Sequence, residues 1–435
     1  MKGNFKIIVL VAFVFFAVFA VMVFAGLIKL GADKNATVPT GTVVLWGTVK
    51  STVMNPLLVD FNEANKTFSV RYVQKYPETF DQDLLEAIAS GTGPDMFFLP
   101  DSLAFSYSNK IYTIPYTSYP ISTFKNTFAS AGEVFTTSKG ILAFPIIIDP
   151  LVMYYNRSML DTNNIVYPPL YWDEFTKLVP VFTQKNVDKQ IISSAVALGQ
   201  YSNVLNAKDI ISALFMQAGS NIVSEKNGYY STDFEQGGQG SQNGKSNLGP
   251  ILSFYTSFAD PLKENYSWNK SLPNSRDFFS SDKSAFYFGF ASELQALISK
   301  NPNQNFAVTA VPQIKNANTK TTSARVTGVA ASSFSKNLNT AFTAASLMAT
   351  GNFAKQFADA LGVAPARRDL LSTKPADSYF PVFYSSALFA KSWLDPSPQD
   401  SSAVFKSMID KVLSNTSTPE ESVREAGSRL NLLLR

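Results

Sequence analysis

The hydrophobic pattern opens with one long apolar stretch. No charged residue occurs from Ile7 to Ile28, and Lys2, Lys6 and Lys29 flank this run. At about 1.5 Å per helical residue it is long enough to cross a hydrocarbon core about 30 Å thick. The positive charge before it favours an orientation in which the rest of the chain lies outside the cytoplasm. A cleavable signal peptide, whose apolar region is usually about 7–15 residues, is the alternative, and it also predicts export.

Residues 29–40 are polar with Gly and Pro, which predicts a tether. After it the pattern changes between continuous or alternating apolar runs and runs with apolar residues every three to four positions. These predict, in order, a strand, a helix, a strand, a helix and a strand: Thr42–Trp46, Asn55–Phe61, Phe68–Val73, Phe80–Ile88 and Asp95–Leu99. Such an order implies a parallel sheet with right-handed crossovers.

The remainder repeats this theme less regularly. It predicts helices at Trp172–Val181, where Pro180 should end or kink the helix, at Ala207–Ala218, and at Thr340–Ala360 with a break near Gly351. Strands are predicted at Ile191–Leu198, Phe306–Val311 and Arg325–Ala331, and a Gly- and Gln-rich surface loop at residues 233–249. Near the C-terminus, Thr418, Pro419 and Glu421 form the start of a helix with a capping box.

Composition narrows the possible chemistry. The chain of 435 residues is 46% hydrophobic and 16% charged, which excludes disorder and leaves room for two or three domains. It has no Cys and no His, so thiol nucleophiles, disulfides, Ser-His-Asp triads and Cys- or His-based zinc sites are excluded. The formal net charge of +4 gives no electrostatic case for nucleic-acid binding. We therefore expect no cofactor and no metal.

Six segments carry motifs in a consistent order from about residue 41 to the C-terminus. They are VVLWGT at Val43–Thr48, LLEAIASGTGPDMFF at Leu84–Phe98, GILAFPIIIDPLVMYYNRSML at Gly140–Leu160, PPLYWDEF at Pro168–Phe175, FAVTAVP at Phe306–Pro312 and TPEESVREA at Thr418–Ala426. Together they resemble the extracellular solute-binding proteins of ABC transporters, family 1, the sugar-binding maltose-binding-protein type.

The resemblance implies an α/β fold of the periplasmic-binding-protein-like type II, with two lobes joined by a hinge. Lobe one would comprise residues 41–148 and 329–368, and lobe two residues 150–327 and 369–435. The protein would not be an enzyme. It would capture a small molecule, a mono- or oligosaccharide, and deliver it to an ABC transporter permease by cleft closure. The apolar run broken by Asp149 and Pro150 suits a strand passing between lobes, where Pro150 would interrupt pairing.

Several residues are candidate ligand contacts. Asp149 lies inside an apolar run and matches a hinge carboxylate of the family, although an Asp before Pro is also a common turn. Trp46 and Thr48 follow the first strand, at the end of the sheet where ligands bind in open α/β folds, whereas core packing is the alternative for Trp46. Asp101 follows the strand DMFFL, but the family's usual Trp is missing there.

Three further aromatic segments complete the candidate site. Tyr201 follows a predicted strand end. Phe288 and Phe290 match a segment where the family often has a Trp, and either ring would still stack on a sugar. Trp393 lies in a Pro-rich stretch and would close the cleft from lobe two, with surface packing as the alternative.

Other functions stay open. A glycosidase with two carboxylates needs neither His nor Cys, but no pair stands out by spacing. A sensory module would use the same fold without transport. A peptide or polyamine ligand is the third alternative, because the expected Trp is missing after the DMFF segment.

Overall fold

The computed structural model describes residues 38–234, 248–317, 319–373 and 375–435. The apolar run at residues 7–28 and most of the loop predicted at residues 233–249 lie outside these ranges. Among the described residues, no helix combines the length and hydrophobicity needed to cross a membrane. The chain divides into Met1–Thr40 and Gly41–Arg435, and every described helix and strand belongs to the second unit.

The sheet begins with the predicted parallel unit. Strand β1 (Gly41–Gly47) lies between β2 (Phe68–Gln74) and β3 (Met96–Pro100) and is parallel to both. Helices α2 (Ser51–Ala64) and α3 (Phe80–Ala89) connect the three strands. The predicted order and the parallel pairing are therefore confirmed.

Two long strands continue the sheet. β13 (Thr322–Ala331) is antiparallel to β3 on one side and to the first part of β6 (Phe144–Asn156) on the other. As expected, β6 passes through Asp149 and Pro150 as one strand, and its pairing with β13 does not continue beyond Pro150. The strand changes partner there, because Pro150 still pairs with β13 whereas Leu151 already pairs with Phe290 of β11. A residue without an N–H fits this position, where one ladder ends and the next begins.

The second part of the sheet is built around the end of β6. β11 (Ser284–Phe290) and β12 (Phe306–Ala310) are antiparallel to β6, and β8 (Ile191–Val196) is parallel to β11. With β7 (Gln184–Lys185) at the far edge, the order of the main path is β2-β1-β3-β13-β6-β11-β8-β7. The predicted strands are thus confirmed with end shifts of a few residues.

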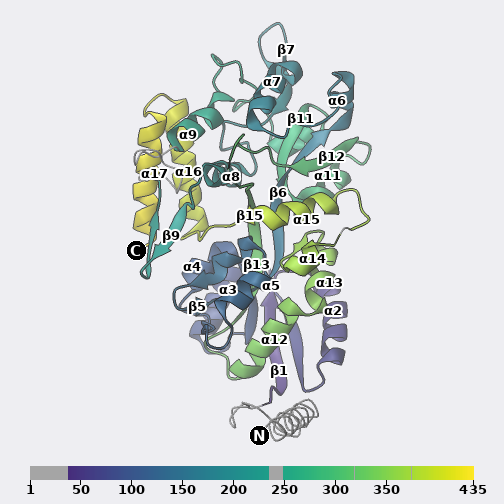
Figure 1. Ribbon diagram of the computed structural model, residues 1–435, viewed down its shortest axis with the longest axis vertical. Coiled ribbons are helices and arrows are strands. Elements are labelled where there is room, and N and C mark those ends of the chain that lie inside the picture. Colours follow the sequence, from purple (N-terminus) through teal and green to yellow (C-terminus); the bar gives the residue numbers. More distant parts are fainter. Residues whose placement is uncertain (1–37, 235–247, 318, 374) are drawn as a thin grey trace, which may run out of the picture. The chain divides into compact units, whose positions relative to one another are not determined.

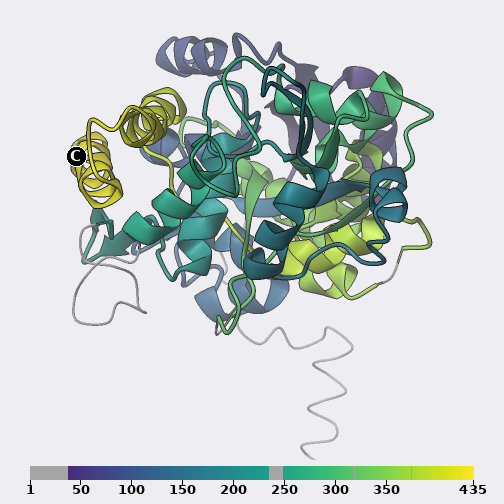
Figure 2. The same ribbon diagram turned by 90° about the horizontal axis from the view of Figure 1, so that it is seen from above.

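The helices confirm most of the predicted boundaries. Helix α7 (Trp172–Phe182) includes Pro180 and ends two residues beyond it, so this proline does not end the helix. Helix α8 spans Ala207–Gln217, and Gly351 separates the two helices predicted on either side of it. Three helices pack together at one edge: α9 (Leu248–Ser257), α16 (Pro398–Leu413) and α17 (Pro419–Leu433) (Figures 1 and 2).

The other helical elements are α4 (Ala104–Tyr107), α5 (Ile121–Thr127), α6 (Arg157–Thr162), α10 (Ser275–Ser280), α11 (Leu294–Lys300), α12 (Leu338–Thr350), α13 (Asn352–Leu361), α14 (Arg368–Leu371), α15 (Phe380–Phe389), η1 (Asp101–Leu103), η2 (Ser130–Phe135) and η4 (Ala291–Glu293). The other strands are β4 (Thr136–Thr137), β5 (Gly140–Ile141), β9 (Val223–Lys226), β10 (Tyr229–Thr232), β14 (Ala364–Pro365) and β15 (Ala390–Lys391).

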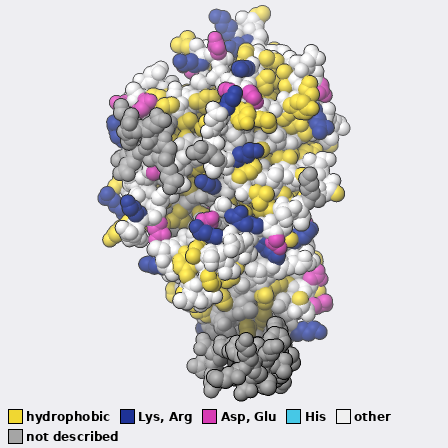
Figure 3. Space-filling view, in the orientation of Figure 1, with side chains coloured by type: hydrophobic (Ala, Val, Ile, Leu, Met, Phe, Trp, Pro, Cys, Tyr) yellow, Lys and Arg dark blue, Asp and Glu magenta, His cyan; other side chains and the backbone are white. Residues whose placement is uncertain are grey.

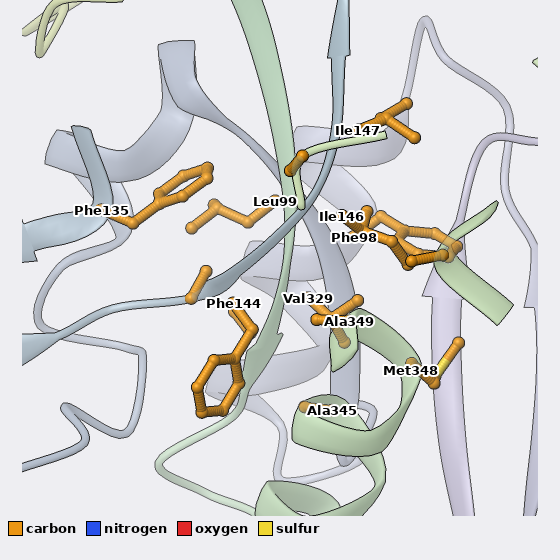
Figure 4. Close-up of a cluster of buried hydrophobic side chains, with 14 of the residues drawn as sticks. Phe98, Leu99, Phe135, Phe144, Ile146, Ile147, Val329, Ala345, Met348 and Ala349 are labelled. Carbon is orange, nitrogen blue, oxygen red and sulfur yellow. The ribbon is translucent and has the colours of Figure 1, made fainter. Parts of the chain in front are cut away.

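Two large hydrophobic cores flank the point where β6 changes partner. The first, shown in part in Figure 4, is built on β1, β3, β13 and the first half of β6, and it extends along the chain to Ala390. The second contains residues between Leu151 and Val311, and again residues between Trp393 and Leu434. A smaller third cluster covers the opposite face of the second half of β6, through Val152 and Tyr154. Strands β6 and β13 therefore connect two separately packed regions.

Candidate functional site

A cavity of about 710 Å³ lies where these two strands pass between the cores. Its lining comes from the end of β3 with η1, the middle of β6 and β13, the segment from Tyr201 into the start of α8, and residues 392–402. Ser292, Leu361 and Val363 complete it. Of the eight residues predicted to contact ligand, the cavity brings together Asp101, Asp149, Tyr201 and Trp393. This volume is in the range of small-molecule sites.

Asp149 lies on β6 opposite Arg325 of β13. Ser292 donates its backbone N–H and its hydroxyl to the two carboxylate oxygens, at 2.9 and 2.6 Å. Burial raises the pKa of Asp149 to about 6, although the bonds from Ser292 and the charge of Arg325 oppose this shift. A carboxylate already held by neutral donors is thus fixed in orientation at the cavity wall.

Asp101 is the first residue of η1 and is only 8% exposed. Its carboxylate accepts hydrogen bonds from the backbone N–H of Ser102, at 2.9 Å, and from the hydroxyl of Ser392. Burial raises its pKa to about 6 as well. Because Ser392 lies far along the chain, this bond ties the end of β3 to the segment that closes the cavity from the other side.

The two aromatic lining residues differ in what they offer. Tyr201 is half-buried, and burial raises the pKa of its hydroxyl. Trp393 is 8% exposed and stacks on Phe405, with ring centroids 6.1 Å apart, while the ammonium of Lys208 lies 5.4 Å from its ring centroid. Trp393 therefore has little free ring face to offer a ligand.

The other four candidates do not line this cavity. Phe288 and Phe290 are 2% and 0% exposed, because β11 is buried along its whole length. The guanidinium of Arg325 lies 3.8 Å from the centre of the Phe290 ring, so this Phe packs against a residue that lines the cavity. Trp46 is half-buried under the ammonium of Lys75, and Thr48 is exposed. Their roles as ligand contacts stay predictions without support from the cavity geometry.

Sequence reasoning missed most of the charged lining. Lys208 pairs with Asp395 at 2.5 Å and donates to Ser401 at 2.9 Å. Arg325 reaches Asp209 at 3.4 Å, and burial raises the pKa of Asp209. Lys208 and Asp209 lie in the first turn of α8, a few residues after the candidate Tyr201. This closeness in sequence is the local signal that could have identified them.

Within the described ranges, no group of three or more Asp, Glu, His or Cys side chains is arranged to hold a metal ion. What the cavity offers is hydrogen-bonding carboxylates, two cationic side chains and a few apolar walls, an arrangement suited to binding a polar solute.

Comparisons with known proteins agree with this geometry. The family model described as bacterial extracellular solute-binding protein matches residues 57–381. No protein among the curated sequences matches the chain.

Solved structures show the same fold at low sequence identity. One is a cyclo/maltodextrin-binding protein complexed with maltotetraose, at a TM-score of 0.71 and 15% identity over 89% of this chain and 96% of that one. Another is a maltose-binding periplasmic protein from Listeria monocytogenes in complex with maltose, at a TM-score of 0.69 and 16% identity over 90% of this chain and 97% of that one. A third structure has mannobiose bound, and it matches at a TM-score of 0.63 and 16% identity over 90% of this chain and 100% of that one. With the family model matching most of its length, the chain belongs to the bacterial extracellular solute-binding proteins.

Proposed function

We propose that the protein binds a mono- or oligosaccharide in the 710 Å³ cavity and delivers it to the permease of an ABC importer. The observation that carries the proposal is the position of this cavity, where β6 and β13 connect two hydrophobic cores and where Asp101 and Asp149 are held by neutral donors. Carboxylates accept hydrogen bonds from sugar hydroxyls. The structural neighbours named above were solved with maltotetraose, maltose and mannobiose, which supports the choice of ligand class.

The proposed mechanism is closure of two lobes about the strands that connect them. Lobe one would contain residues 41–148 and 329–368, and lobe two residues 150–327 and 369–435. A ligand that contacts both lobes favours the closed arrangement by the difference between its affinities for the two states. Asp101, which follows β3 of the first core, and Tyr201, which packs against the second core, both line the cavity and would make such contacts.

The location proposed for this activity is the outer face of the cell membrane. Residues 7–28 would anchor the chain, which keeps the binding unit close to its permease and raises its effective concentration there. Membrane fractionation of cells that express the full chain tests the anchor. Recovery of the protein in the soluble extracytoplasmic fraction, shortened by about the length of this segment, would replace the anchor with a cleaved signal.

A thermal-shift screen tests the function. The unfolding midpoint should rise with the concentration of one class of saccharide, since a ligand that binds only the folded state stabilises it. Asp149→Ala should abolish the rise, whereas Asp188→Ala, which changes an exposed carboxyl on the loop between β7 and β8, should keep it. A rise with an amino acid or a short peptide and with no saccharide would overturn the proposed ligand class.

A further inference from the structure

The cavity carries a surplus of negative charge that the protein as a whole does not share. Its lining contains four carboxylates, Asp101, Asp149, Asp209 and Asp395, but only two cationic side chains, Lys208 and Arg325. The formal net charge of the whole chain is +4. On the face shown in Figure 3, Lys and Arg side chains are scattered among acidic ones. The surplus is thus a local property of the binding site.

Ion pairing divides the four carboxylates into two kinds. Lys208 pairs with Asp395, and Arg325 pairs with Asp209. Among the described residues, no Lys or Arg forms an ion pair with Asp101 or Asp149, whose direct partners are serine hydroxyls and backbone N–H groups. Arg325 acts on Asp149 only at longer range. Two carboxylates, Asp101 buried and Asp149 partly buried, therefore remain without a cation of their own.

Buried charges of this kind are costly unless a partner compensates them. Removal from water disfavours the ionised carboxylate, and burial indeed raises the pKa of both groups. A positive charge brought by a ligand would lower this cost, since a Coulomb interaction is stronger at a partly buried site than in water. Of the two aromatic rings in the lining, that of Trp393 is already covered by Phe405.

We propose that the cavity selects a saccharide that carries an ammonium group, such as an amino sugar or its oligomer, with the ammonium against the carboxylates of Asp101 and Asp149. This inference rests on the proposed function, the binding of a saccharide in the same cavity. The negative charge of the lining favours an ammonium group on that saccharide.

Calorimetric titration of the full-length protein with matched pairs of sugars tests the proposal. The pairs are glucosamine and glucose, galactosamine and galactose, mannosamine and mannose, and the β-1,4 glucosamine disaccharide and cellobiose. Maltose and spermidine serve as neutral and non-saccharide references. At pH 6.5 and low salt we expect the amino member of at least one pair to bind about tenfold more tightly than its neutral partner. This advantage should shrink in 0.5 M NaCl, because salt screens the ionic term.

The outcomes separate the two proposals. If neutral sugars bind as tightly as their amino partners or more tightly, the ammonium inference is wrong and saccharide binding stands. If no saccharide binds, or only spermidine binds, both proposals are wrong.

Variants locate the ammonium. Asp101→Asn and Asp149→Asn are made separately, and circular dichroism first establishes that each is folded. At least one of them should reduce the amino preference to threefold or less, while Asp188→Asn, at an exposed position, should leave it at tenfold. A tenfold preference that persists in both cavity variants would show that these carboxylates do not bind the ammonium, and would overturn the assignment.

Discussion

Replacing Asp101 by Asn should make the protein more stable at neutral pH. Burial raises the pKa of this carboxyl from an ordinary value of 3.8 to about 6. The folded state therefore binds more protons than the unfolded state in this window, and stability is lost as the pH rises through it. At about 1.4 kcal/mol per pKa unit, the ionised group costs roughly 3 kcal/mol at pH 7.5, of which about 1.4 kcal/mol appears between pH 5 and pH 7.5.

Asn fits the same partners without the charge. Its carbonyl oxygen can accept from the N–H of Ser102, and its amide can donate to the hydroxyl of Ser392. Urea unfolding at pH 5 and pH 7.5 should show that the free-energy difference between variant and wild type grows by about 1.4 kcal/mol at the higher pH. Asp188→Asn should show no such change. The same difference at both pH values would mean that ionisation of Asp101 costs nothing in the fold.

Three further changes test an ion pair of the site, the packing of the first core and the cap of a helix. Lys208→Met leaves the buried Asp395 without its cation and should cost about 3 kcal/mol in urea unfolding, most of it recovered by adding Asp395→Leu; no recovery would refute the pairing argument. Gly328→Ala places a Cβ 2.8 Å from that of Ala143, and this overpacking should lower the free energy of unfolding by about 1–3 kcal/mol. The thermal midpoint should fall accordingly, and an unchanged midpoint would contradict this expectation. Thr418→Ala removes the N-cap of α17 and should cost about 1 kcal/mol, with faster amide exchange confined to its first turn.

Local patterns predicted the regular elements well. The first three strands and two helices alternate between clear strand and helix periods, and the structure pairs them as expected. The cap formed by Thr418, Pro419 and Glu421 is likewise a local signal, and the structure contains all of its hydrogen bonds. Pro180 was misleading because a proline in a helix loses only its own N–H bond and crowds the carbonyl four residues before it, and α7 tolerates this and continues two residues further.

The binding site was harder to predict because its members meet only through the fold. Arg325 faces Asp149 through the register of two strands that are far apart in sequence, and Asp395 reaches Lys208 from another region again. Phe288 and Phe290 illustrate a second limit. A strand buried on both faces gives no alternation that would tell an inward ring from a ligand-facing one.

The long pairing of β6 with β13 has a consequence for the order in which the chain folds. Val326 pairs with Ile148, so the first core contains contacts between segments separated by well over a hundred residues, and it also needs α15. Contacts of this separation form slowly, since a large loop must close before they contribute. We expect a chain that ends before β13 to leave the apolar residues of β3 and β6 accessible. Rapid protease cleavage of a chain ending at residue 320, against resistance of the complete chain, would show this. The first core cannot form until the last quarter of the chain has been synthesised. Such a chain is suited to crossing a membrane before it folds.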